Sequence, residues 1–241
     1  MFISIRALIA TAAFSACAAI PAAAQPSSAA ADRPLFVDVN AGIGAKPSPL
    51  TAGTTFTIFG EDGSAATEVA PGLSGLADFR VGYHVNPKVA IAVALSGSQS
   101  TAAAATTASV PNPIRFNSPT IVSLEAAEST RREIGVHLQA SYALPLSAGL
   151  MLTIAGGPSI VHLQQGIPSV TISGTTPTIV SANESGNGFG GNVGADVSTF
   201  FSERYGLGVF VRYVAAKVDL PSASGVTVGG VQVGAGLRLR F

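Results

Sequence analysis

The chain ends on a stretch of strictly alternating polarity, Gly229-Gly230-Val231-Gln232-Val233-Gly234-Ala235-Gly236-Leu237-Arg238-Leu239-Arg240-Phe241. From Val231 onward the odd-numbered residues are apolar, whereas the even-numbered ones are glycine, glutamine or arginine. Successive side chains of a β-strand point to opposite faces, so this stretch predicts a strand with one apolar face and one small or polar face. An uncharged apolar face is what a strand that contacts lipid requires.

The composition of the whole chain fits such an environment. Of its 241 residues, 47% are hydrophobic and only 11% are charged, against roughly 25% charged residues in an average soluble domain. The mean hydropathy is +0.46, yet the longest purely apolar stretch after residue 25, from Val89 to Leu95, is far shorter than the ~20 residues of a spanning helix. The 13 basic and 13 acidic residues balance, so no net charge favours nucleic acid as a partner. Membrane-spanning strands explain this combination better than helices.

The first residues are typical of a secretory signal peptide. Arg6 precedes an apolar segment, and Pro21 is followed by the small residues Ala22-Ala23-Ala24. We therefore predict a signal peptide at residues 1–24, a flexible linker at 25–34 and a barrel domain at 35–241. The single cysteine, Cys17, lies in the signal peptide, so the mature chain is expected to need no disulfide. Lipidation of Cys17 is the alternative, although Phe14 stands where lipoprotein sites prefer a leucine-like residue.

The same alternation occurs in eight segments. They cover approximately residues 35–45, 76–85, 88–98, 132–144, 150–163, 188–199, 205–217 and 228–241. Connections are short after the second, fourth and sixth segments, and long after the first, third and fifth. We therefore predict an all-β fold, an eight-stranded antiparallel transmembrane β-barrel with short periplasmic turns and long extracellular loops. The strands of a water-soluble sandwich also alternate, but their charged residues lie on the outward face. Here the charged residues alternate in step with glycine and serine, and the opposite face of each strand carries almost no charge.

Several local features are expected within this pattern. Gly156-Gly157-Pro158 blurs the parity of the fifth segment and predicts a bulge. The first loop contains an alternating stretch, residues 54–63, that predicts a short hairpin with its turn at Asp62-Gly63. The end of the second loop, from Glu125 to Arg132, predicts a short helix, and the third loop is rich in Ser, Thr and Gly. Aromatic residues at segment ends predict an interfacial girdle: Tyr83, Tyr142, Phe200, Phe201, Tyr205 and Phe241.

Three motifs carry a resemblance to a known family. They are the final stretch ending in Phe241, Gly82-Tyr83 before Asn86-Pro87, and Gly194-Ala195-Asp196-Val197 before Phe200-Phe201. From Leu35 to Phe241 the chain resembles the outer-membrane β-barrel domain family, which groups OmpA-type, OmpX-type and OmpW-type proteins of Gram-negative bacteria. The resemblance implies location in the cell outer membrane and contact with outer-membrane lipid and lipopolysaccharide. It also implies that Phe241 is an assembly signal read by the barrel-assembly machinery, and we expect no peptidoglycan-binding domain after the eighth strand.

The inward-facing charged residues are the candidate functional site. We predict a lumen charge network of Asp38, Arg80, Glu133, His137, Asp196, Arg212 and Arg238. Side chains fill the interior of an eight-stranded barrel, where unpaired charges are costly. Strand positions predict the pairs Asp38–Arg238, Asp38–Arg80 and Asp196–Arg212. The expected function is structural or surface-interacting, with the lumen plugged by salt bridges; the alternative is a charge gate in a narrow channel for ions or small apolar molecules.

A lipid-modifying enzyme is the less favoured reading. Some eight-stranded barrels modify lipids, and one such deacylase uses a His-x-Ser pair, but none of His84, His137 and His162 has serine two positions later. No histidines have the spacing of metal ligands. We therefore expect no catalytic residue, no metal and no cofactor, although a triad of distant residues stays open because triads are recognised by geometry. The long loops could bind an extracellular ligand.

Overall fold

The computed structural model describes residues 33–45, 49–70, 72–124, 128–147, 149–173 and 176–241. The predicted signal peptide and most of the predicted linker lie outside these ranges, as does Cys17. In the part of the chain that is described, no helix is long and apolar enough to cross a membrane.

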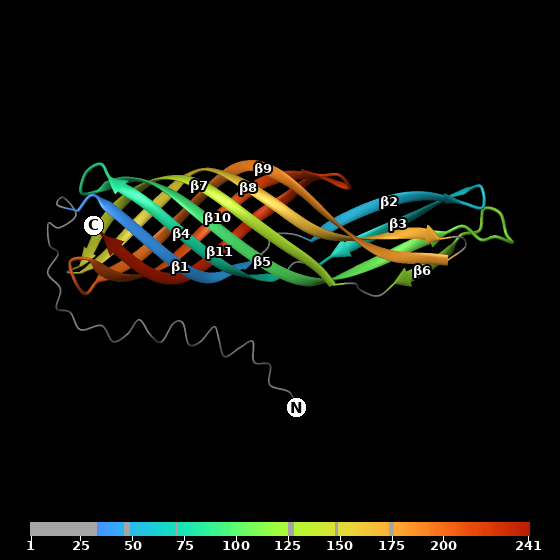
Figure 1. Cartoon of the computed structure of the whole chain (residues 1–241), viewed down its shortest axis with the longest axis horizontal. Helices are drawn as coiled ribbons and strands as arrows, with labels where there is room; N and C mark the ends of the chain where they lie inside the picture. Colours follow the sequence, from blue (N-terminus) through green and yellow to red (C-terminus); the bar gives the residue numbers. More distant parts are fainter. Residues whose placement is uncertain (1–32, 46–48, 71, 125–127, 148, 174–175) are drawn as a thin grey trace, which may run out of the picture.

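Eleven antiparallel strands make up the described chain (Figure 1). They are β1 (Leu35–Ala45), β2 (Leu50–Ile58), β3 (Glu61–Val69), β4 (Leu73–His84), β5 (Val89–Val110), β6 (Thr120–Leu124), β7 (Glu128–Ser147), β8 (Leu150–Ser173), β9 (Thr176–Phe200), β10 (Tyr205–Leu220) and β11 (Ala223–Arg240). Eight of them form a closed ring in the order β1-β4-β5-β7-β8-β9-β10-β11, and β11 pairs with β1 to close it. The predicted all-β, eight-stranded ring is confirmed.

One end of the ring carries the tight connections and is named the short-turn end. Residues 85–88, Gly149 and residues 201–204 lie there, with the start of β1 and the end of β11 (Figure 1). Asn86 Oδ1 accepts hydrogen bonds from the backbone N–H of Lys88 (2.9 Å) and Val89 (2.8 Å). Ser202 Oγ accepts similarly from Arg204 and Tyr205, at 3.3 and 3.0 Å. Asn and Ser therefore close these turns by the side-chain-to-backbone bonds that such residues favour.

At the opposite, distal end the strands are much longer than predicted. β8 and β9 stay paired from Leu150↔Thr199 to Ser173↔Thr176, so most of the Ser/Thr/Gly-rich third loop is a hairpin. β7 begins at Glu128, so the helix predicted up to Arg132 is wrong over residues 128–132, and Glu125 lies outside the described residues. These segments continue as strands because pairing satisfies their backbone groups, on both sides up to Gln165 of β8 and from Gly188 of β9, and on one side in the outer part of the hairpin.

The distal end also carries a separate small sheet. β2, β3, the outer part of β5 and β6 pair in that order, and we name them the distal sheet. The hairpin predicted in the first loop is therefore confirmed. Its turn, however, is at Phe59-Gly60 and not at Asp62-Gly63, since Ile58 pairs with Glu61.

The bulge predicted at Gly156–Pro158 is wrong. His137↔Ser159 and Ala140↔Gly156 keep one register between β7 and β8, and the shift occurs instead between Pro145 and Ser147. A Cβ on Gly157 would collide with the backbone oxygen of Leu138. Glycine is therefore needed there because β7 passes close by.

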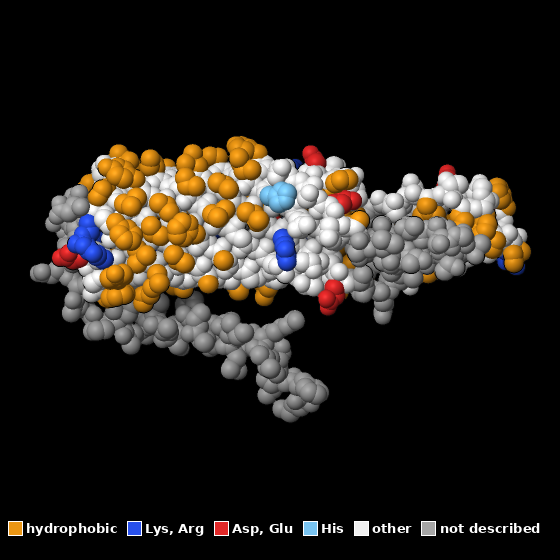
Figure 2. All heavy atoms as spheres, viewed as in Figure 1, with side chains coloured by type: hydrophobic (Ala, Val, Ile, Leu, Met, Phe, Trp, Pro, Cys, Tyr) orange, Lys and Arg blue, Asp and Glu red, His pale blue; other side chains and the backbone are white. Residues whose placement is uncertain are grey.

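The outward face of the ring forms an apolar belt next to the short-turn end (Figure 2). Exposed side chains such as Val93 (53%), Leu138 (56%) and Leu237 (50%) cover it. Five of the predicted girdle aromatics are exposed at the short-turn end, namely Tyr83, Tyr142, Phe201, Tyr205 and Phe241. Phe200 instead lies under the buried guanidinium of Arg240, 3.5 Å from ring centre to Cζ, so its assignment to the girdle is wrong.

Candidate functional site

The lumen next to the short-turn end contains a buried ion-pair network. Arg80 Nε lies 2.7 Å from Asp38 Oδ2, and Arg238 Nε lies 3.8 Å from Asp38 Oδ1. Register explains both contacts, because Asp38 stands directly opposite Arg238 on β11 and Arg80 on β4. Arg238 also forms an ion pair with Asp196, which is on β9. One arginine thus joins carboxylates from two strands.

A second set of contacts extends this network across the lumen. Arg212 Nη1 lies 2.9 Å from Asp78 Oδ2, and Arg212 Nε donates to Gln232 Oε1 at 2.8 Å. Asn40 links the two halves: its Nδ2 donates to Asp78 Oδ1 at 3.0 Å, and its Oδ1 accepts from Arg238 Nη1 at 2.6 Å. We name Asp38, Asn40, Asp78, Arg80, Asp196, Arg212, Gln232 and Arg238 the polar layer. Its three arginines and three aspartates balance in charge.

The predicted pairing of Asp196 with Arg212 is wrong. Arg212 stands opposite Gly194 on β9, and Asp196 stands opposite Phe210. The long side chain of Arg212 instead reaches Asp78 on the far side of the ring, while Asp196 is taken by Arg238. Asp78, the partner that completes the network, shares the parity of Arg80 in the sequence but is not part of the predicted network.

His137 lies apart from the ion pairs, in a chain of neutral hydrogen bonds. Its Nε2 is 2.8 Å from Ser96 Oγ and its Nδ1 is 2.8 Å from Ser159 Oγ. Asn192 donates to Ser159 Oγ at 2.9 Å and accepts from Gln139 at 2.7 Å. His137 is 0% exposed. A serine–histidine contact is the geometry of an activated nucleophile, but here the ring is enclosed between β5 and β8.

Glu133 belongs to a third group, nearer the distal end. Arg131 Nε lies 2.7 Å from Glu133 Oε1, and Arg131 Nη2 donates to the Thr227 carbonyl at 2.9 Å. Glu133 Oε2 accepts from the backbone N–H of Gly229 at 3.2 Å. Both side chains therefore bridge from β7 to β11. Arg131 was missed because it was placed in a helix, although its odd number matches the inward parity of Glu133.

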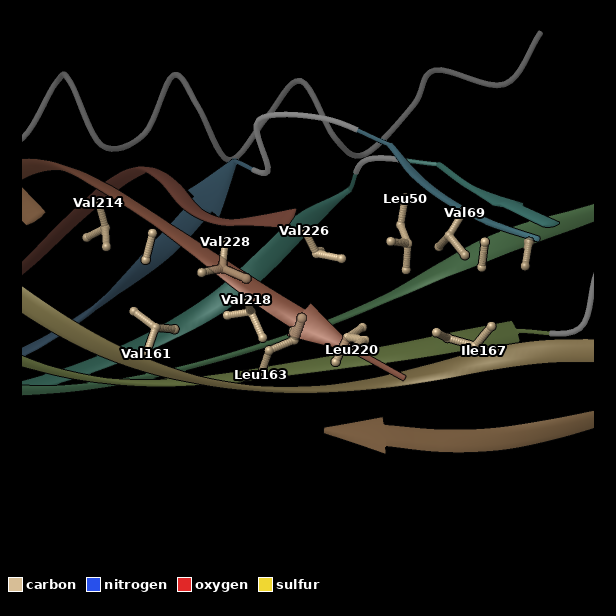
Figure 3. Close-up of a cluster of buried hydrophobic side chains, with 13 residues drawn as sticks. Leu50, Val69, Val161, Leu163, Ile167, Val214, Val218, Leu220, Val226 and Val228 are labelled. Atoms are coloured by element: carbon tan, nitrogen blue, oxygen red, sulfur yellow. The ribbon is translucent and has the colours of Figure 1, made fainter. Parts of the chain in front are cut away.

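An apolar layer fills the lumen beyond the polar layer, at the level of the Arg131–Glu133 pair, because Glu133 stands directly opposite Leu163 (Figure 3). Its buried members are Leu50, Ala52, Val69, Ala104, Val161, Leu163, Ile167, Val214, Ala216, Val218, Leu220, Val226 and Val228. They come from the ring strands β5, β8, β10 and β11 and from the base of the β2–β3 hairpin. Leu163 and Val228 are 0% exposed and Val214 and Val218 are 1% exposed, so this layer is closely packed.

The apolar layer arises from a switch in strand polarity. On β10, apolar residues occupy odd positions up to Tyr213 and even positions from Val214 to Leu220. Lys217 and Asp219 then take the outward positions, and His162 and Gln164 do so on β8. Beyond the belt, β8 and β10 are therefore polar outside and mainly apolar inside, as in a water-soluble barrel, whereas β7 keeps Ser129, Arg131 and Glu133 buried on its inward face. The switch begins within the last residues of the predicted segments 205–217 and 150–163, but most of it lies beyond their predicted ends.

A small cavity, about 40 Å³, lies within the polar layer. Asp78, Arg212, Gln139 and Ala155 are among its lining residues. Arg212 Nη2 and Gln139 Oε1 are buried and have no hydrogen-bond partner among the described residues. A space of this size has room for a few water molecules, which could satisfy both atoms.

The remaining histidines and possible metal ligands do not form a site in the described part of the chain. The half-buried ring of His84 stacks at 5.0 Å from that of Phe36, and outward-facing His162 is 2.8 Å from Asn187 Oδ1. Among the described residues, no group of three or more His, Cys, Asp or Glu could hold a metal ion.

Comparison with known proteins was made at the level of family, sequence and structure. The family model described as outer membrane protein beta-barrel domain matches residues 10–238. No curated protein matches the chain. Similar solved structures include neisserial surface protein A, with 12% identity, a TM-score of 0.44, and coverage of 86% of this chain and 97% of that one. The outer membrane protein OprG of Pseudomonas aeruginosa has 11% identity and a TM-score of 0.40 over 87% and 96% of the two chains.

A third similar structure is the outer membrane protease OmpT of Escherichia coli, with 9% identity, a TM-score of 0.41, and coverage of 86% and 97%. Members of the family have diverse roles, and the match assigns the architecture and the location. Because the family model spans most of a chain whose strands close into the ring described above, this protein belongs to the outer membrane β-barrel domain family and is located in the cell outer membrane.

Proposed function

We propose that this protein is a closed outer-membrane barrel with a structural and surface-presenting role. The observation that carries the proposal is the apolar layer above the polar layer, because together they fill the lumen at two levels. The short-turn end is taken as periplasmic, since short periplasmic turns and long extracellular loops are typical of these barrels. The distal sheet and the β8–β9 hairpin then project outside the cell.

The apolar layer argues against the alternative of a narrow channel. Ion pairs alone could separate and reform as a gate, because water can replace each partner. Leu163, Val218 and Val228 are almost fully buried and offer no group to coordinate a hydrated ion. Passage of an ion would require it to lose water between these apolar side chains, beside an Arg131–Glu133 pair whose charges already compensate each other, which is unfavourable.

The geometry also argues against an enzyme that uses the serine–histidine contact. Ser96 is 5% exposed and His137 is 0% exposed, and the hydrogen bonds of the ring are already taken by two serines. A substrate carbonyl would need space beside both side chains. We propose that this group makes the wall rigid, because the hydrogen bonds of His137 to Ser96 and Ser159 hold β5, β7 and β8 in one packing arrangement.

The proposed partners follow from the outer surface. Arg132 and Lys217 face outward just beyond the belt, where cations could meet phosphate groups of lipopolysaccharide. Phe241 is 57% exposed and its N–H donates to the Leu35 carbonyl at 2.8 Å, which seals the β1–β11 closure. We propose that this terminal residue is read by the barrel-assembly machinery before the ring closes.

Single-channel recording in planar bilayers tests the closed lumen. We expect no conductance steps from the wild-type protein, and none from Arg80→Ala or Asp38→Ala, because each variant leaves the apolar layer intact. The double variant Leu163→Gly and Val228→Gly is the control for the apolar layer and should increase leak. Regular steps from the wild-type protein would overturn the proposal, and steps that appear only in Arg80→Ala would show that the polar layer is a gate.

A further inference from the structure

The far end of the distal sheet presents large apolar side chains to water. Ile114 is 90% exposed, Phe116 is 75% exposed, and Phe59 in the neighbouring turn is 44% exposed. We name these three residues, with Arg115, the distal tip. Hydrophobic side chains gather at this end of the molecule, opposite the end that carries the belt (Figure 2). Exposed apolar patches isolated in this way mark interaction sites.

The backbone holds the distal tip in a defined shape. Asn112 Oδ1 accepts from the N–H groups of Ile114 (2.9 Å) and Arg115 (3.2 Å). The N–H of Asn117 donates to Glu61 Oε1 at 2.6 Å, which ties the β5–β6 loop to the β2–β3 hairpin. Asn117 and Phe59 both have positive φ, of 60° and 56°. For a bulky residue such as phenylalanine this conformation is costly, and such strain concentrates at functional sites.

The size of the distal tip favours a lipid surface over a protein. Three partly exposed side chains of this kind offer about 400 Å² of apolar area. A stable protein interface requires about 800 Å² on each partner. The tip is also a protrusion formed by two turns. A bilayer has no such area threshold, since each inserted aromatic or aliphatic side chain contributes separately.

The charge around the distal tip further defines which kind of lipid surface it would bind. Arg115 is close in sequence to the apolar residues, whereas Glu61 and Asp62 flank the Phe59-Gly60 turn and accept hydrogen bonds from Asn117 and Thr57. One cation and two anions give no net attraction for an anionic membrane. The outer part of β5, from Gln99 to Val110, places the tip about 30 Å beyond the belt.

From these observations we propose that the distal tip inserts Phe59, Ile114 and Phe116 into an apposed, zwitterionic lipid bilayer. This inference rests on the proposed surface-presenting role and adds the chemical class of the partner. Two membranes would be linked, one through the belt and one through the tip. The contact depends on apolar insertion, so added salt should change it little.

A tryptophan probe tests insertion directly, because the chain contains no tryptophan. The full chain carrying Phe116→Trp is reconstituted in nanodiscs and mixed with phosphatidylcholine vesicles that contain brominated acyl chains. We expect blue-shifted emission that the bromine atoms quench. The matched control is Ile121→Trp, at a 64% exposed residue of β6 set back from the tip, which should not be quenched. Co-flotation with vesicles should fall at least about tenfold in the double variant Ile114→Ser and Phe116→Ser.

Absence of quenching in a folded, heat-modifiable Phe116→Trp protein would overturn the inference. Sedimentation as a dimer without vesicles, abolished by the double serine variant, would also overturn it, because the tip would then bind a second copy. Equal quenching in the Phe116→Trp and Ile121→Trp proteins would contradict it as well, since it would indicate lipid exchange and no specific insertion. These outcomes are separate from bilayer conductance, so the closed lumen and the tip can fail independently.

Discussion

At the scale of single residues, Arg238 is the central group of the lumen. It contacts Asp38, Asp196 and Asn40 with its guanidinium and is only 3% exposed. Burying these charges is costly in itself, so the network adds little stability over an apolar filling. Removing the positive charge of Arg238 is different, because the carboxylates that it contacts then stay buried without that compensating charge.

Arg238→Met keeps the length of the side chain and removes its charge. We expect the free energy of unfolding to fall by about 3–5 kcal/mol, since Asp196 is left buried without its cation. Urea-induced unfolding from lipid vesicles measures this change. Arg33→Met is the matched control, because the exposed Arg33–Glu203 pair (2.8 Å) should contribute at most about 1 kcal/mol. Equal losses in both variants would contradict the role of Arg238.

The sequence could predict only part of this network. Asp38–Arg80 and Asp38–Arg238 follow from register, because neighbouring strands place these residues opposite one another. Asp78–Arg212 joins strands that are not neighbours and crosses the lumen. Such a contact depends on ring curvature, strand stagger and the reach of an arginine, and none of these can be read from alternation.

At the scale of elements, β10 shows how one strand is adapted to lipid over one part of its length and to water over the other. Its outward face is apolar up to Tyr213 and polar at Lys217 and Asp219, while its inward face changes in the opposite direction. The change marks where the wall leaves lipid for water. Alternation predicted the strand and its parity, but ending the strand at Lys217 hid the second half of the pattern.

Val218→Thr tests the inward apolar half of β10 without changing side-chain volume appreciably. Val218 is 1% exposed, so the new hydroxyl would be buried among apolar groups and should lower the free energy of unfolding by about 1–3 kcal/mol. Ala215→Ser, on the outward face of the same strand, should change it by less than about 0.5 kcal/mol. If the substitution at residue 215 lowered the free energy of unfolding as much as the substitution at residue 218, the inward face would not be the more water-excluded one.

The β2–β3 hairpin carries its own local strain at Phe59. Residues 59 and 60 both have positive φ, the turn geometry that favours asparagine followed by glycine. Phe59→Asn should therefore slow amide hydrogen exchange in β2 and β3 by about threefold to tenfold, while exchange in the ring strands stays the same. Faster exchange in the hairpin would mean that Phe59 stabilises the turn, and the strain would then have no functional meaning.

At the scale of the whole molecule, the ring has no free edge. β1 and β11 pair from Phe36↔Arg240 to Ala45↔Val231, which joins the two ends of the barrel domain. The eight-stranded ring was predictable, because parity and connection lengths repeat along the whole chain. The tall distal end was not, since its segments rich in Ser, Thr, Ala and Gly lack the clear alternation of apolar and polar residues that predicts a strand.

Closure predicts resistance to detergent. The folded protein should migrate differently on a dodecyl sulfate gel before and after boiling. Every ring strand has hydrogen-bonded neighbours on both sides, so without heat the detergent finds no unpaired strand at which to start unfolding the ring. Arg33→Met should behave like wild type. Identical mobility of heated and unheated samples would contradict the closed ring.

Closure of the lumen by the apolar layer is the central claim, and cysteine accessibility tests it most directly. The only native cysteine, Cys17, lies in the predicted signal peptide. Ala155→Cys places a thiol at the cavity inside the polar layer, and Thr107→Cys places one on the exposed distal sheet. With a charged thiol reagent applied from outside the cell, we predict that the thiol at position 107 reacts at once and that the thiol at position 155 reacts only after unfolding. Equal reaction rates at the two positions in the folded protein would show an open path through the lumen.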